Sequence, residues 1–104
     1  MKKILFVLLA LTAAAFASEA EVANQTLKAY SMIAAGVGLG LAALGGAIGM
    51  GHTAAATIAG TARNPGLGGK LMTTMFIALA MIEAQVIYTL VIALIALYAN
   101  PYLG

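Results

Sequence analysis

The sequence contains no cysteine and no tryptophan, and it has only three acidic and five basic residues. The lack of cysteine excludes disulfide bonds, thiolate chemistry and cysteine-ligated metal sites. The net charge of +2 comes from scattered basic residues, which argues against a nucleic-acid-binding surface. Three phenylalanines and four tyrosines are also too few bulky side chains for an ordinary soluble core.

Apolar residues dominate what is present. Hydrophobic residues make up 63% of the 104 positions and charged residues only 8%, which indicates a membrane protein. Because lipid offers the backbone no hydrogen-bond partners, only helices and closed barrels can span a bilayer. No stretch has the short alternating pattern of barrel strands, so we expect helices.

The N-terminal stretch has the layout of a secretory signal peptide. Two lysines precede a short apolar run, and an Ala-Phe-Ala site follows at 15–17. We therefore predict that residues 1–17 are a signal peptide cleaved after Ala17, followed by a short polar segment at 18–27. The alternative is an uncleaved third helix, in which the alanines continue the apolar run.

The remaining apolar residues form two stretches, each longer than the ~20 residues that a bilayer requires. We predict transmembrane helices at 28–62 and 70–99, a polar loop at 63–69 and a tail at 100–104. The loop combines helix-breaking glycines and a proline with flanking basic residues, which places it in the cytoplasm and both termini on the other side. The predicted fold class is an all-α membrane protein, a hairpin of two transmembrane helices.

The first transmembrane stretch is rich in glycine, which weakens a helix in water by about 1 kcal/mol per residue relative to alanine. In lipid, small residues spaced four apart let another backbone approach closely. Such pairs fall here on more than one side of the helix, which favours a closed homo-oligomeric ring over a simple dimer. The glycines expected to pack against other helices are Gly36, Gly38, Gly40, Gly45, Gly46, Gly49 and Gly51.

Two segments of this stretch, GLGLAA and GMGHTA, also match the dinucleotide-binding pattern G-x-G-x-x-A. That pattern binds a pyrophosphate only between a strand and a helix N-terminus. Neither segment has that setting, so we expect no nucleotide and no other cofactor.

The second transmembrane stretch contains a lone acid, Glu83, with no basic residue nearby. Ionised in apolar surroundings it would cost at least ~2.5 to 3.5 kcal/mol, so Glu83 is expected to hold its proton. This makes Glu83 a candidate for reversible proton binding, with a purely structural hydrogen bond as the alternative. Tyr88 can donate a hydrogen bond to the acid, and Thr89 is a less direct candidate. One carboxylate is too few for a metal site.

Two further polar side chains lie within the spans. Gln85 is two residues from the acid and so on another face of the helix, where packing or a water contact is expected. His52 should lie nearer the cytoplasmic surface than Glu83, tucked away or facing water rather than relaying protons.

The glycine-rich helix, the Arg63-Asn64-Pro65 loop, the acid 20 residues beyond Arg63 and the closing YANP together resemble the c subunit, or proteolipid, of F-type ATP synthases. The resemblance covers nearly all of residues 28–102. Many members lack an N-terminal extension and begin directly with the first helix. The resemblance implies a ring of hairpins in the bacterial inner membrane, with glycine-rich helices inside and acid-bearing helices facing lipid.

The resemblance also implies roles for particular residues. Glu83 would bind the proton and exchange it at the interface with the a subunit of the synthase, whose arginine stabilises the carboxylate. The Arg63-Asn64-Pro65 loop would meet the central stalk, formed by the gamma and epsilon subunits. Tyr88 matches a tyrosine that hydrogen-bonds the acid in sodium-binding relatives. Nucleotide chemistry would occur in partner subunits, so the chain is expected to be part of a rotor and not an enzyme.

The carried ion is expected to be a proton. Sodium-type relatives have a first-helix glutamine and a serine just after the acid, where this chain has Met50 and Ala84. A thioether and a methyl group cannot replace those oxygen ligands. A sodium carrier, a holin-like pore and a scaffold hairpin are the alternatives.

The signal-peptide interpretation predicts a shortened mature protein. Intact mass measurement of the chain purified from membranes should give a mature N-terminus near Ser18. A mass that retains Met1 would contradict cleavage.

Overall fold

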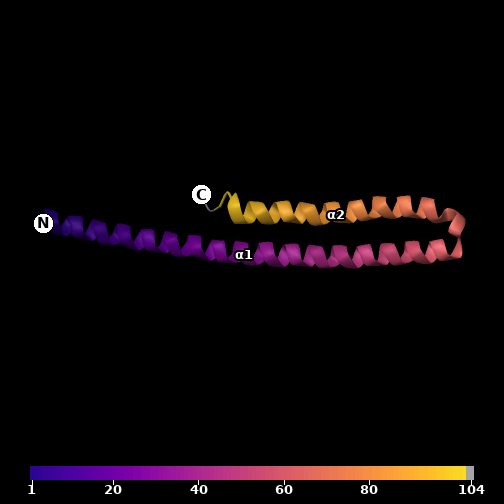
Figure 1. Cartoon of the computed structure of the whole chain (residues 1–104). Coiled ribbons are helices and arrows are strands. Elements are labelled where there is room, and N and C mark those ends of the chain that lie inside the picture. Colours follow the sequence, from indigo (N-terminus) through magenta and orange to yellow (C-terminus); the bar gives the residue numbers. More distant parts are fainter. Residues whose placement is uncertain (103–104) are drawn as a thin grey trace.

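The chain folds as a helical hairpin (Figure 1), for which a computed structural model describes residues 1–102. Helix α1 covers Lys2–Arg63, a short 3-10 helix η1 covers Pro65–Leu67, and helix α2 covers Gly68–Tyr98. Helices α1 and α2 lie side by side and antiparallel (Figure 1). The predicted all-α hairpin is therefore confirmed. Residues 103–104 of the predicted tail lie outside the described residues.

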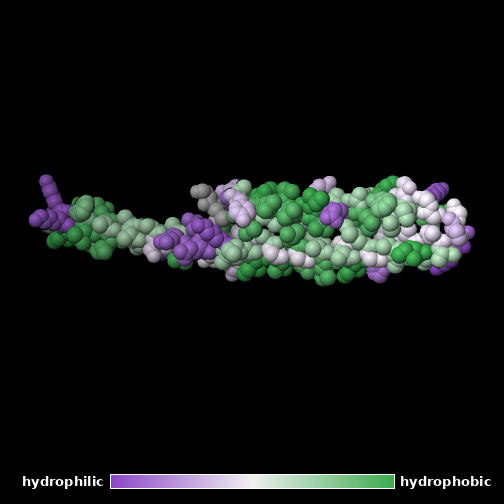
Figure 2. All heavy atoms as spheres, in the orientation of Figure 1, coloured by the Kyte–Doolittle hydropathy of each residue, from purple (hydrophilic) through white to green (hydrophobic). Residues whose placement is uncertain are grey.

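Both long helices are long and apolar enough to cross a membrane. Helix α2 has 31 residues and packs beside the C-terminal half of α1, which has 62. At a rise of 1.5 Å per residue α1 is about 93 Å long, roughly three times the thickness of the hydrocarbon layer. Figure 2 shows a largely hydrophobic surface along the hairpin, with hydrophilic groups at its two ends and a small hydrophilic group midway along α2.

The N-terminal part of α1 projects beyond the end of α2 without contacting it (Figure 1). Side chains 1–26 are all exposed. The helix runs without a break through both predicted boundaries, the one at residue 17 and the one at residue 27. Cleavage after Ala17 stays a prediction.

The turn between the helices is shorter than the predicted loop at 63–69. Asn64 leaves the helical conformation with φ −135° and ψ 80°, and its N–H donates to the carbonyl of Gly60 at 3.0 Å. Pro65 follows at the start of η1, where its missing N–H leaves no helical bond unmade. Helix α2 already begins at Gly68, which adopts ordinary right-handed helical angles.

The two helices meet along one continuous seam. Buried and half-buried positions recur on both helices at intervals of three and four residues, a spacing that keeps one stripe turned toward a partner. The stripe on α1 consists of small residues: Ser31, Ala35, Gly38, Ala42, Gly46, Gly49, Thr53, Thr57 and Gly60. The stripe on α2 includes larger ones: Leu71, Met75, Ala78, Ile82, Val86, Thr89, Ala93 and Ala96, and Asn100 continues it just beyond the end of the helix.

Among the glycines of the described residues, Gly46 leaves the least room for a side chain. A Cβ atom placed on Gly46 would lie 2.8 Å from Cγ2 of Val86, whereas one on Gly49 would meet Ile82 at an ordinary 3.5 Å. By contrast, a Cβ on any of Gly36, Gly40, Gly45 and Gly51 would meet nothing within 4 Å. Some glycines thus serve the hairpin itself, while others remain open, and their packing against further helices stays a prediction.

A polar contact ties the open end of the hairpin. Asn100 Nδ2 donates to Ser31 Oγ at 3.2 Å and also reaches the carbonyl of Ala96 at 3.4 Å. Ser31 is only 8% exposed, so its hydroxyl lies between the helices. This contact joins the start of one span to the end of the other.

The contact at Gly46 predicts a specific intolerance. Gly46→Ala should destabilise the hairpin by about 1 to 3 kcal/mol, because Val86 is β-branched and cannot easily turn away. Unfolding in mixed detergent micelles measures this change. Val86→Ala added to Gly46→Ala should recover much of the loss.

Gly49→Ala is the matched control, because its Cβ fits without displacement. Equal destabilisation by both glycine substitutions would contradict the close contact at Gly46.

Candidate ion-binding site

Glu83 lies at the middle of α2. It is equidistant in sequence from the ends of that helix, Gly68 and Tyr98, so each end is about 22 Å away along the helix axis. Gly49 of α1 lies at nearly the same depth, because it packs against the adjacent residue Ile82. The carboxyl group is therefore held at mid-depth of the hairpin.

The surface around Glu83 is apolar. The carboxylic side chain is exposed, as are Met81 at 66% and Ile87 at 48%. Within residues 1–102 its carboxyl group makes no hydrogen bond, and the nearest side-chain bond runs from Thr89 to the carbonyl of Gln85 at 3.2 Å. A single chain thus leaves this acid without a polar partner.

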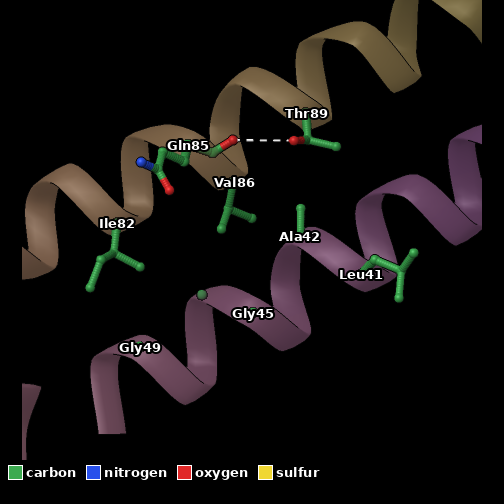
Figure 3. Close-up of a pocket in the computed structure, with 9 residues that line it drawn as sticks. Leu41, Ala42, Gly45, Gly49, Ile82, Gln85, Val86 and Thr89 are labelled. Carbon is green, nitrogen blue, oxygen red and sulfur yellow. Dashed lines mark hydrogen bonds between the residues drawn. The ribbon is translucent and has the colours of Figure 1, made fainter. Parts of the chain in front are cut away.

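Glu83 and Gln85 lie on opposite edges of α2. Each helical residue turns about 100° from the one before it. Glu83 follows the seam residue Ile82 by one position, and Gln85 precedes the seam residue Val86 by one. The two side chains therefore flank the seam on its two sides, and Gln85 borders a groove beside Gly45 (Figure 3).

The single chain does not bring Tyr88 and Glu83 together. Five residues correspond to about 140° around a helix, which puts Tyr88 on the Gln85 side of α2. The tyrosine is 67% exposed, and the described residues form no hydrogen bond between it and the acid. Tyr88 as a support for Glu83 stays a prediction, and it requires a second copy of the chain.

The other candidate residues lie away from the acid. Arg63, Asn64 and Pro65 are all exposed. They lie at the turn, at the closed end of the hairpin where α1 meets the start of α2. His52 is exposed on α1. It lies nearer the turn than Gly49, the residue that packs against Ile82 beside the acid. The turn and the acid are therefore separate sites. Within residues 1–102, no three histidine, aspartate or glutamate side chains gather to hold a metal ion.

The tie between Ser31 and Asn100 was not anticipated from the sequence. Both are small polar residues at the ends of spans, and 69 positions separate them. The sequence does show that each residue continues the three-and-four spacing of its stripe. That spacing identifies them as partners only once the register between the two helices is known.

Comparison with known proteins agrees with this geometry. Residues 33–96 match the family model for the C subunit of ATP synthase. The chain is 88% identical to the ATP synthase c subunit of Sulfurimonas denitrificans and 79% identical to that of Aliarcobacter butzleri, over the full length of each protein. It is also 81% identical to the corresponding protein of a Sulfurovum species, again over both full lengths.

The membrane hairpin, the mid-depth acid and these full-length matches lead to one assignment. The chain belongs to the family of ATP synthase c subunits, whose members form the ring-shaped rotor of the membrane sector of ATP synthase.

Proposed function

We propose that this rotor protein carries protons, and that Glu83 binds and releases one proton per copy in each turn of the ring. The observation that supports this most directly is the position of Glu83, at mid-depth of an apolar helix and without a charged partner. An ionised carboxylate there is costly, so the acid keeps its proton while it faces lipid. It ionises only where water and a compensating positive charge are available.

The ion supported best is the proton. Sodium requires several oxygen ligands, and Met50 and Ala84 supply none at the positions where sodium-type relatives have an amide and a hydroxyl. A single carboxylate needs no further ligand to hold a proton. Tyr88 of an adjacent copy is the candidate hydrogen-bond donor to the acid.

The rotor requires partners at two levels of the membrane. At mid-depth, Glu83 would meet the a subunit, whose arginine stabilises the transient carboxylate. At the turn, Arg63, Asn64 and Pro65 would contact the gamma and epsilon subunits of the central stalk. This places the turn in the cytoplasm and the hairpin termini on the periplasmic side of the bacterial inner membrane, in keeping with the basic residues near the turn.

The energy of single transfers explains why the acid works within a ring. One charge that crosses 100 mV yields about 2.3 kcal/mol, far less than the synthesis of a nucleoside triphosphate requires. Rotation sums successive transfers, and the nucleotide chemistry takes place elsewhere in the complex. The rotor protein itself is non-catalytic.

Replacement of the acid tests the proposal. Glu83→Gln keeps the size of the side chain but cannot release a proton, so proton-driven ATP synthesis in membrane vesicles should be abolished while the ring still assembles. Glu21→Gln, which removes an acid outside the spans, is the matched control and should retain activity. Undiminished synthesis in Glu83→Gln would contradict proton carriage by this residue. A pore or a scaffold hairpin would be unaffected by the substitution.

The choice of ion predicts an absence of sodium protection. Carbodiimides react with a protonated carboxyl group, so a bound sodium ion would shield Glu83 from labelling. Labelling of purified rings at neutral pH should proceed at the same rate with and without sodium chloride, at constant ionic strength. Slower labelling in sodium would overturn proton specificity.

A further inference from the structure

A groove of about 430 Å³ opens between α1 and α2 at the middle of the hairpin (Figure 3). Its floor and walls include Gly45, Gly46, Gly49, Ile82, Gln85 and Val86. A Cβ atom placed on the bare backbone of Gly45 would have nothing within 4 Å, so this side of the hairpin is open to a close partner.

Gln85 and Thr89 are polar residues of α2 that line this groove, and Gln85 lies on the side of the seam away from Glu83. The backbone carbonyl of Gln85 accepts the hydrogen bond from the Thr89 hydroxyl. The side-chain amide of Gln85 has no hydrogen-bond partner within residues 1–102. An amide left unpaired in lipid is costly. A partner that covers the groove would remove that cost if it offered a polar group at the same depth.

Ring symmetry determines which surface covers the groove. In a ring, neighbouring copies are related by rotation, so one edge of each copy meets the opposite edge of the next. Glu83 lies on one edge of α2 and Gln85 on the other, and only two residues separate them along the axis. The acid of one copy therefore faces the groove of its neighbour at almost the same depth.

We propose that Gln85 of the neighbouring copy hydrogen-bonds the carboxyl group of Glu83 and so completes the proton site between copies; this inference rests on the proposed proton binding at Glu83. A protonated carboxyl donates its O–H to the amide oxygen, and the amide N–H donates to the carboxyl C=O. Gln85 thereby acts as a positioning residue that holds the neutral acid in one orientation. The occupant of the groove is thus a second copy of this chain.

Infrared spectroscopy of assembled rings tests this bond. The C=O stretching band of protonated Glu83 is identified by its loss in Glu83→Gln. Gln85→Leu removes the amide at similar size, so the band should move to higher frequency as the carboxyl C=O loses a donor. Thr89→Val, which removes a hydroxyl bonded within its own helix, is the matched control and should leave the band unmoved.

The possible outcomes separate the two proposals. Absence of a protonated Glu83 band at neutral pH would overturn the proposed proton binding. A band that is present but unchanged by Gln85→Leu would overturn the role of Gln85 alone, and would leave the groove facing lipid or an apolar surface.

A second test uses the absence of native cysteine. In Glu83→Cys/Gln85→Cys the two thiols lie on opposite edges of one helix, so a short thiol-bridging reagent should join them only between copies and yield a ladder of covalent oligomers. Glu83→Cys/Ile87→Cys places both thiols on one edge and should give no ladder. Assembled rings of the first variant that stay uncross-linked would overturn the proposed contact.

Discussion

The close approach of α1 and α2 at the seam is the constraint on which the arrangement of the polar groups depends. Val86 packs directly against the backbone of Gly46, which a side chain at that position would prevent. Lipid provides little hydrophobic force between helices, so such contacts must come from shape and van der Waals packing. Once this contact is made, depth and rotation of α2 relative to α1 are both set.

The register of the seam separates the functional groups of the chain. It holds Glu83 at mid-depth and the Arg63-Asn64-Pro65 turn at one end. It also turns Glu83 to one edge of the hairpin and Gln85 to the other. A monomer therefore carries one polar side chain on each edge, and the open glycines of α1 leave room for a close neighbour. This geometry is suited to a ring, in which every edge is covered.

Several features could be predicted because they depend on local composition. The two spans follow from hydropathy, and Glu83 stands out because an unpaired acid in lipid is costly wherever its helix packs. Details that depend on contacts could not be obtained in this way. The start of α2 at Gly68 was missed by two residues, since glycine and proline signal a break without defining its length. The hydrogen bond between Ser31 and Asn100 could not be predicted either, because it depends on the register between α1 and α2.

By itself, the sequence determined that this protein is a helical membrane hairpin with a single acid within its spans, because the cost of exposing polar backbone and charge to lipid acts on each segment separately. Only the tertiary structure decided which glycines contact α2, which remain open, and that the seam passes between Glu83 and Gln85, so that they lie on opposite edges of the hairpin. Those properties depend on the rotation of one helix against the other, and this is set by the packing of side chains such as Val86 on the bare backbone of α1.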